Sequence, residues 1–307
     1  MPDLIKVLES PFVSIIIPYY KNIGTISRAV QSVIDQTEKS WELIVVDDGS
    51  NDELETIIKS FEPEKITLIK KPNSGPSDSR NRGAKLATGK FLAFLDSDDW
   101  LSPDWLENFK KKHQENGFDI AFCYGALIDE ETGEREDWTK FVKLKIHGEE
   151  AKFNNLVGTF LVRSSIFENA RAFDPNLRYS ENMDLAIRIM RLVPPSKRFY
   201  LEEVMVFFGN TIEPKKRNQK YGRALLLKDL AYFQQKHKQV LLENTSFLRA
   251  IIRRQLVSAT VCWNWKIYIL KLKELYSYSV GDGLKFTLLF FFLPFNRMRL
   301  LSHGFRK

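Results

Sequence analysis

Residues 91–99 of this 307-residue chain read FLAFLDSDD, and this is the most informative stretch of the sequence. A short, uniformly apolar run is typical of a strand buried on both faces, as in a parallel sheet. An acidic turn, Asp96-Ser97-Asp98-Asp99, follows the strand directly. Carboxylates crowded on one turn repel one another unless a cation lies among them, so the turn suggests a cation site. The alternative is a solvated loop whose aspartates cap the next helix.

The same succession of strand and helix repeats on both sides of this stretch. We expect further strands at residues 12–17, 41–46, 66–69 and 119–124, and helices at 25–36, 52–61, 77–88 and 103–116. The alternation predicts an open α/β sheet, mostly parallel and flanked by helices. Ligands bind outside the carboxyl ends of such strands. The strand ends at residues 18–20, 47–48 and 96–98 are therefore expected at one edge of the sheet.

The residues at this edge exclude two common nucleotide sites. The first strand is followed by PYYKNIGT (18–25) rather than GxGxxG, and no GxxxxGK[ST] loop exists. Oxygen ligands on the acidic turn suit Mg²⁺ or Mn²⁺, which bridge to substrate phosphates. A carboxylate of Asp47 or Asp48 can accept a hydrogen bond from a base or a ribose, or else cap its own turn. Arg80 can meet a phosphate or form a surface ion pair.

Three segments in order carry a family resemblance: SIIIPYYKN (14–22), SVIDQTEKSWELIVVDDGSND (32–52) and NSGPSDSRNRGAKLATGKFLAFLDSDDWLSPDWL (73–106). Together they resemble the donor-binding half of family-two glycosyltransferases of the GT-A fold. The similarity is dense over residues 11–125, thinner over 155–192 and absent over 215–307. It implies a nucleotide-diphospho-sugar donor, with a UDP-sugar favoured, a divalent Mn²⁺ or Mg²⁺ cofactor, and transfer with inversion at the anomeric carbon.

The resemblance also implies roles for the residues at the sheet edge. Pro18 and Tyr20 would border the base. Asp48 would hydrogen-bond the ring or the ribose. We add Asp47 and Arg80 to the predicted nucleotide site because of their expected position at the same sheet edge.

The resemblance assigns the cation to the acidic turn. Asp98 would be the chief metal ligand, and Asp96 would lie toward the ribose or reach the metal through water. A metal there would neutralise the charge that develops on the departing nucleoside diphosphate.

The acceptor half departs from the family pattern at one position. Residues 157–189 read VGTFLVRSSIFENARAFDPNLRYSENMDLAIRI, and Glu181-Asn182 stands where the family usually has Glu-Asp. That aspartate is the usual general base, and an asparagine amide is not a base at neutral pH. Glu181 can take over the role, with Asp184 as a less favoured substitute. Alternatively, Asn182 only orients the acceptor hydroxyl, or the protein is a weakly active or silent relative.

The charge distribution predicts two domains. Residues 1–210 carry 27 Lys and Arg against 34 Asp and Glu, whereas residues 211–307 carry 19 against 5. We expect a catalytic domain at 1–210, with a donor half at about 11–125 and an acceptor half at 126–210. A basic helical tail follows at 211–307, with helices at 221–245 and 246–275. Two cysteines exclude a disulfide framework or a structural zinc site.

The basic tail indicates an anionic partner. Nucleic acid is disfavoured because no aromatic and basic stacking platform is evident. The apolar stretch FTLLFFFLPF (286–295) is shorter than the ~20 residues of a membrane-spanning helix. We therefore expect an interfacial segment at 284–303 on an anionic membrane surface, or else a buried core helix, with a true membrane span as the least favoured alternative. Residues 1–9 lack the apolar core of a secretory signal. The predicted location is cytoplasmic and peripheral, on the inner face of the plasma membrane.

The sequence thus predicts a metal-dependent transferase of sugar from a UDP-sugar to a glycan or lipid-linked acceptor, in cell-surface polysaccharide or glycolipid assembly. One alternative is a silent relative that binds a nucleotide sugar or a partner. A second alternative is a nucleotidyltransferase, which would use a metal at the same sheet edge.

Overall fold

The structure is a computed structural model that describes residues 10–61, 64–210 and 219–291. Its contacts divide the chain into two compact units. The first comprises Met1–Pro175 and Glu181–Glu213, and the second comprises Asn176–Ser180 and Pro214–Lys307. The part of the expected interfacial segment 284–303 that follows residue 291 lies outside the described residues.

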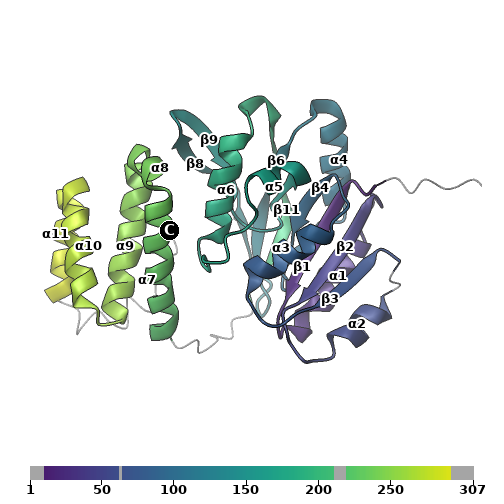
Figure 1. Ribbon diagram of the computed structural model, residues 1–307, viewed down its shortest axis with the longest axis horizontal. Coiled ribbons are helices and arrows are strands. Elements are labelled where there is room, and N and C mark those ends of the chain that lie inside the picture. Colours follow the sequence, from purple (N-terminus) through teal and green to yellow (C-terminus); the bar gives the residue numbers. More distant parts are fainter. Residues whose placement is uncertain (1–9, 62–63, 211–218, 292–307) are drawn as a thin grey trace, which may run out of the picture. The chain divides into compact units, whose positions relative to one another are not determined.

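A mixed sheet forms the centre of the first unit (Figure 1), in the order β3-β2-β1-β4-β10-β6-β11-β5 with β7 paired to β6. The strands are β1 (Val13–Tyr19), β2 (Trp41–Asp47), β3 (Ile66–Lys70), β4 (Phe91–Phe94), β5 (Trp100–Leu101), β6 (Ile120–Asp129), β7 (Arg135–Trp138), β10 (Phe160–Arg163) and β11 (Arg198–Asn210). The predicted α/β class is confirmed. Pairing is parallel from β3 to β4, but β10 lies antiparallel between β4 and β6.

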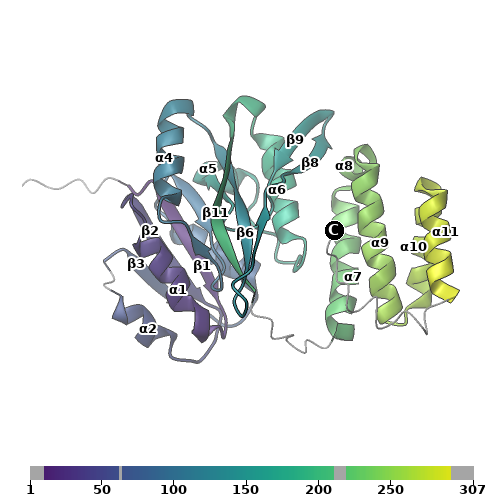
Figure 2. The ribbon, with the colours of Figure 1, turned by 180° about the vertical axis from the view of Figure 1, so that it is seen from behind.

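Helices cover both faces of this sheet (Figures 1 and 2). One face carries α3 (Pro76–Leu86), α5 (Ser164–Asn169) and α6 (Glu181–Leu192), and the other carries α1 (Ile23–Ile34) and α4 (Trp105–Asn116). The short α2 (Leu54–Ser60) follows β2, and β8 (Val142–Ile146) pairs with β9 (Glu149–Phe153) as a separate hairpin.

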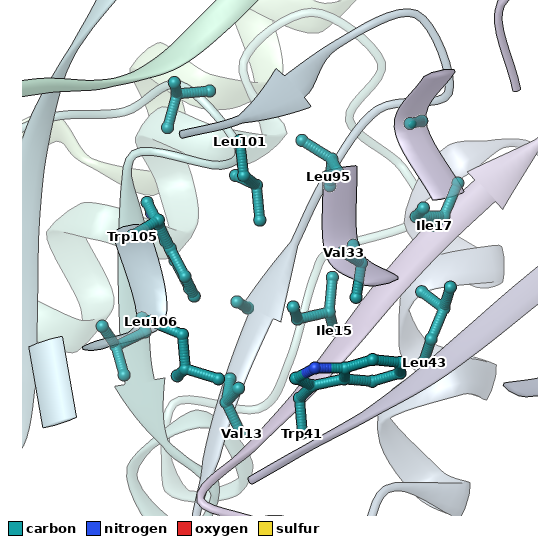
Figure 3. Packing of buried hydrophobic residues seen from close by; sticks show 14 of the residues in the cluster. Val13, Ile15, Ile17, Val33, Trp41, Leu43, Leu95, Leu101, Trp105 and Leu106 are labelled. Atoms are coloured by element: carbon teal, nitrogen blue, oxygen red, sulfur yellow. The ribbon is translucent and has the colours of Figure 1, made fainter. Parts of the chain in front are cut away.

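Successive side chains of β1 point to opposite faces of the sheet, so they pack against the helices on both faces. Val13, Ile15 and Ile17 are fully buried in the cluster shown in Figure 3, which includes residues of α1, β2 and α4. Each such side chain contributes about 1.5–3 kcal/mol by its burial. Ile16 points to the opposite face. There a Cβ on Gly83 would lie 2.5 Å from Ile16 Cγ2, so α3 packs closely on β1 because Gly83 has no side chain.

The register of β1 places two acidic turns at one edge of the sheet. Tyr19, the last residue of β1, pairs with Asp47 of β2, while Ile16 pairs with Phe94 at the end of β4. Both pairings are parallel, so β2 and β4 end on the same side as β1. The turns at 47–50 and 96–99 therefore begin at the same edge, on either side of β1.

Apart from Asn176–Ser180 and short breaks, the described residues of the second unit are helical. Its helices are α7 (Gln219–Lys236), α8 (Lys238–Glu243), α9 (Thr245–Val261), α10 (Trp265–Tyr278) and α11 (Val280–Phe291). The expectation of two long helices over 221–275 is wrong, because polar breaks divide them. At one break, Asn264 Oδ1 accepts from Ile267 N at 3.1 Å and caps α10. Within the described residues, no helix combines the length and hydropathy needed to cross a bilayer.

Candidate active site

The carboxylate of Asp48 is held by the loop that follows β3. It accepts hydrogen bonds from Ser74 N and Gly75 N, each at 2.8 Å, and an ion pair from Lys71 Nζ. The side chains of Lys71 and Asp48 are 1% and 5% exposed. A carboxylate offers about four lone-pair positions. These three donors leave room for one more, such as a base N–H or a ribose hydroxyl.

Two glycines allow the loops around Asp48 to meet. Gly49 has φ 77°, and a Cβ there would lie 3.0 Å from Asn73 N. Gly75 has φ 95° and stands immediately before α3. Both conformations favour glycine. Asp47 faces its own turn, where its Oδ1 accepts from Ser50 N at 2.8 Å.

The acidic turn after β4 is anchored by polar residues on either side of the start of α1. Asn22 Nδ2 donates to Ser97 Oγ at 3.2 Å, and Thr25 Oγ1 donates to the Ser97 carbonyl at 2.8 Å. Arg28 Nη2 donates to the carbonyl of Asp98 at 2.7 Å. The turn is thus held through Ser97 and the main chain, while the carboxylates of Asp96 and Asp98 are half-buried at the surface.

Asp99 lies behind the turn rather than with the other two aspartates. It is buried, and its Oδ1 accepts from Gly209 N of β11 at 3.2 Å. A Cβ on Gly209 would meet the Asp98 carbonyl at 2.5 Å, so β11 reaches the turn only because residue 209 is glycine. Burial, followed by the charges of Asp96 and Asp98, raises the pKa of Asp99 to about 9.

Arg80 connects this turn to the first residue of α6. Its Nη2 donates to Asp96 Oδ1 at 2.6 Å, and its Nη1 lies 3.6 Å from Glu181 Oε1. The Arg80 side chain is 3% exposed, and its carbon Cζ lies 5.3 Å from the ring centre of Phe173. Among the described residues, its Nε and Nη1 have no hydrogen-bond partner. The guanidinium is therefore an incompletely satisfied cation beside two carboxylates.

The three acceptor-side candidates occupy different environments on α6. Glu181 is 8% exposed and faces Arg80. Asp184 is fully buried and ion-paired with Arg188, whose Nε donates to it at 3.0 Å. The amide oxygen of Asn182 is buried, and within the described part of the chain it accepts no hydrogen bond.

Pro18 and Tyr20 lie at the end of β1, beside the turn that carries Asp48, whose N–H donates to the Tyr19 carbonyl at 2.8 Å. Tyr20 is 47% exposed, and Pro18 pairs with Val46 of β2. Sequence reasoning missed Lys71, Arg28 and Gly209. Of these, only Lys71 could have been noticed in the sequence. It is a cation directly after β3, and β3 pairs with β2, which ends at Asp47 and is followed by Asp48.

A family model described as glycosyl transferase family 2 matches residues 14–174. The chain belongs to this family. The match spans β1 to α5, and so includes both acidic turns and Arg80 but ends before Glu181.

Curated relatives of this family-two chain are similar over part of their length. An uncharacterised glycosyltransferase of Rickettsia bellii is 39% identical over 127 residues, which cover 41% of this chain and 18% of that protein. An uncharacterised glycosyltransferase of Rickettsia prowazekii is 33% identical over 217 residues, covering 65% of this chain and 64% of that protein. The chain thus spans less than two thirds of the length of these relatives.

A solved structure shares the fold. The crystal structure of residues 1–349 of S. aureus TarS in complex with UDP superposes with a TM-score of 0.58 at 15% sequence identity. The superposition covers 91% of this chain and 90% of that one. A second crystal structure of the same TarS fragment, in complex with UDP-GlcNAc, has a TM-score of 0.57.

The acidic turn of this family-two chain fits a cation that is shared with a substrate. The described residues contain no group of three or more His, Cys, Asp or Glu side chains arranged for a metal. Asp96 and Asp98 remain as candidate ligands of a cation, because the Asp99 carboxylate accepts a hydrogen bond from Gly209 N. Mg²⁺ is usually bound through one or two carboxylates, with waters and substrate phosphates as further ligands. Two carboxylates therefore suit a cation that arrives with a diphosphate.

Proposed function

We propose that the protein is a glycosyltransferase that moves a sugar from a nucleotide diphosphate to an acceptor hydroxyl with inversion. The observation that carries the proposal is the position of Arg80. Its guanidinium contacts Asp96 on the donor side and lies 3.6 Å from Glu181 on the acceptor side, within one compact unit. Transfer of a sugar requires that the donor and the acceptor are both bound within reach of the same reacting carbon.

The nucleotide would be bound at the loops around Asp48. The remaining acceptor position of Asp48 suits a ribose hydroxyl or a base N–H, and the exposed ring of Tyr20 suits a base. The complexes of TarS with UDP and UDP-GlcNAc favour a uridine donor for a chain of the same fold. Asp47 would support this site indirectly, because its carboxylate closes the turn that presents Asp48.

The diphosphate would lie at the acidic turn. Asp98 and Asp96 would hold a Mn²⁺ or Mg²⁺ ion, which when bound neutralises charge on the leaving diphosphate. Arg80 holds Asp96 in place, and its Nη1 and Nε supply further positive charge at the same point. These donors are already fixed before the reaction, so no reorganisation is needed as the charge develops.

We assign the general base to Glu181. The acceptor oxygen would form a bond to the anomeric carbon as the bond from that carbon to the diphosphate breaks, and the hydroxyl proton would pass to the Glu181 carboxylate. Asp184 is less suited, because it is fully buried and paired with Arg188. The Asn182 amide cannot take the proton, but its buried oxygen can accept a hydrogen bond from the acceptor.

Product analysis tests the reaction class. Incubation of the full chain with a labelled UDP-sugar, Mn²⁺ and candidate acceptors should release free UDP. Formation of pyrophosphate instead would indicate a nucleotidyltransferase, and UDP-sugar binding without any product would indicate a silent relative.

The metal assignment predicts a loss of binding. Asp98→Ala should abolish the Mn²⁺-dependent part of UDP affinity measured by calorimetry, because the cation bridges this carboxylate and the diphosphate. Asp104→Ala is the matched control, since Asp104 is an exposed aspartate just beyond the same turn. Equal UDP affinity of Asp98→Ala and the wild type in Mn²⁺ would show that Asp98 is not a ligand.

We also propose that the basic tail holds the protein on the inner face of the plasma membrane, from the cytoplasmic side. Lipid-linked acceptors of surface polysaccharide or glycolipid assembly are presented there. The support is the composition of residues 211–307, with 19 Lys and Arg against 5 Asp and Glu. Each basic residue near an anionic surface contributes about 1 kcal/mol.

Charge removal tests the tail. Replacing Lys285, Arg297 and Arg299 together by glutamine should release much of the protein from vesicles of phosphatidylglycerol in a sedimentation assay. The matched control replaces the three consecutive lysines 110–112 of α4, which lie in the acidic first unit. If both triple variants remain bound as tightly as the wild type, the tail is not the membrane anchor.

A further inference from the structure

A single guanidinium joins the acidic turn to other parts of the first unit. Arg28, on α1, donates from Nη2 to the Asp98 carbonyl and to Glu130 Oε1, each at 2.7 Å. Its carbon Cζ lies 3.9 Å from the ring centre of Trp100, the first residue of β5. Glu130 directly follows β6. Arg28 therefore attaches the turn to α1, to β5 and to the end of β6, all within one compact unit.

Trp100 belongs to a stack of side chains that holds the strand leaving the turn. Phe207 of β11 pairs with Trp100, and their ring centres are 5.6 Å apart with 23° between the planes. Arg135 of β7 lies over the Phe207 ring, with Cζ 5.6 Å from its centre. Arg28 and Arg135 thus complete a stack of two cations and two rings that comes from four elements. Such contacts are attractive, so Trp100 is fixed directly after the turn.

Gly209 of β11 leaves the space in which Arg28 and its two acceptors meet. A Cβ on Gly209 would lie 2.7 Å from Arg28 Nη2, and it would also overlap the Asp98 carbonyl and Glu130 Oε1. Side-chain carbons do not come this close to other heavy atoms. The guanidinium can therefore bridge the turn and the end of β6 only because residue 209 has no side chain.

These contacts bear on the cation site because they hold the main chain that carries Asp98. The Asp98 residue is half-buried, and the direction of its carboxylate depends on the turn that presents it. Groups that orient metal ligands from behind have large effects, since their mutation typically costs about 10- to 100-fold in metal affinity. Glu130 has a second effect, because its negative charge offsets the positive charge of Arg28 beside a site for a cation.

We infer that Arg28 is a positioning residue for the cation site: with Trp100 and Glu130 it fixes the main chain at Asp98, so that the carboxylates of the turn keep the direction in which they bind Mn²⁺ or Mg²⁺. The inference rests on the proposed function, because that function places the cation on this turn. It goes further in giving α1 and the end of β6 a part in metal binding, although neither supplies a ligand.

The test compares Arg28→Lys and Arg28→Gln in the full chain. Lysine keeps the positive charge but lacks the planar fork that reaches two acceptors and lies on a ring, and glutamine loses the charge as well. In the metal-free protein, hydrogen exchange measured by mass spectrometry should show that the amides of residues 97–99 lose protection in both variants. One of these amides, Asp99 N, closes the turn by donating to the Asp96 carbonyl at 3.1 Å.

Calorimetry measures the effect on the cation. In the presence of UDP, the affinity for Mn²⁺ should fall about 10- to 100-fold in both variants. UDP affinity without Mn²⁺ should be unchanged, because the donors to Asp48 come from another loop. Arg28→Gln separates position from charge: removal of a positive charge beside a cation by itself strengthens cation binding, whereas loss of positioning weakens it.

Arg163→Lys is the matched control. Arg163 pairs with Asp119 at 2.6 Å, and its Cζ lies 5.2 Å from the ring centre of Phe91. Its side chain is 29% exposed, against 35% for Arg28. Arg163 pairs with the first residue of β4, at the end of the strand opposite the acidic turn. This variant should leave the Mn²⁺ affinity and the exchange of residues 97–99 unchanged.

The outcomes separate this inference from the proposed function. If Arg28→Lys keeps the wild-type Mn²⁺ affinity, or Arg28→Gln binds Mn²⁺ more tightly, Arg28 does not position the site. Unchanged exchange of residues 97–99 in both variants, or an equal loss of Mn²⁺ affinity in Arg163→Lys, also contradicts the inference. If the wild type binds UDP no more tightly with Mn²⁺ than without it, the metal-dependent function fails, and exchange in the metal-free protein still decides whether Arg28 holds the turn.

Discussion

Replacing Glu181 by glutamine should lower kcat for sugar transfer by about 10²- to 10⁴-fold, the usual contribution of a positioned general base. Glutamine has nearly the same shape and keeps an oxygen that can face Arg80, so the fold should be retained. UDP affinity should be unchanged, because the donors to Asp48 and the anchors of the acidic turn come from other residues. Steady-state UDP release and calorimetry measure the two quantities.

Two variants of α6 serve as controls for this prediction. Asn182→Asp restores the carboxylate that the family usually has at this position. If it raises turnover by orders of magnitude from near zero, the natural protein is a silent or weak relative. Asp184→Asn should destabilise the fold through the loss of its buried pair with Arg188, with less effect on kcat. Full activity of Glu181→Gln would exclude Glu181 as the base.

Replacing Lys71 by methionine should both destabilise the first unit and weaken nucleotide binding. The substitution removes the cation that pairs with the Asp48 carboxylate, whose side chain is only 5% exposed in the wild type. Removing one partner of a buried ion pair costs roughly 3–5 kcal/mol, and we expect about 3 kcal/mol because two backbone N–H bonds to Asp48 remain. UDP affinity should fall as well, since Asp48 would no longer be held in one orientation. Urea unfolding and calorimetry measure these effects.

Lys59→Met is the matched control. It makes the same chemical change at an ion pair whose side chains, Lys59 and Glu55, are 73% and 45% exposed. Such surface pairs contribute about 0–1 kcal/mol. If Lys71→Met unfolds at the same urea concentration as Lys59→Met, the buried pair with Asp48 does not stabilise the protein.

The alternation of strands and helices in the first 125 residues could be predicted because it depends on local patterns. Apolar strands, helical stripes and turn residues each lie within a few positions of one another. Parallel pairing then follows from buried strands, and it places the turns at 47–50 and 96–99 at one edge. The helical tail was predicted in kind but not in its breaks, because single residues mark them: His237 and Asn244 flank α8, and Asn264 caps the start of α10.

The sequence by itself thus determined the α/β class, the family and the acidic turns at the sheet edge. The tertiary structure decided which cations meet those acids: Lys71 meets Asp48 from 23 positions away, and Arg80 reaches both Asp96 and Glu181. It also decided that Arg28 meets Asp98 and Glu130, which lie 70 and 102 positions further along the chain. The periodicity of apolar residues depends only on residues that are close to one another along the chain. Contacts between residues that are far apart in the sequence depend on how whole helices and strands pack, and no local sequence pattern predicts that packing.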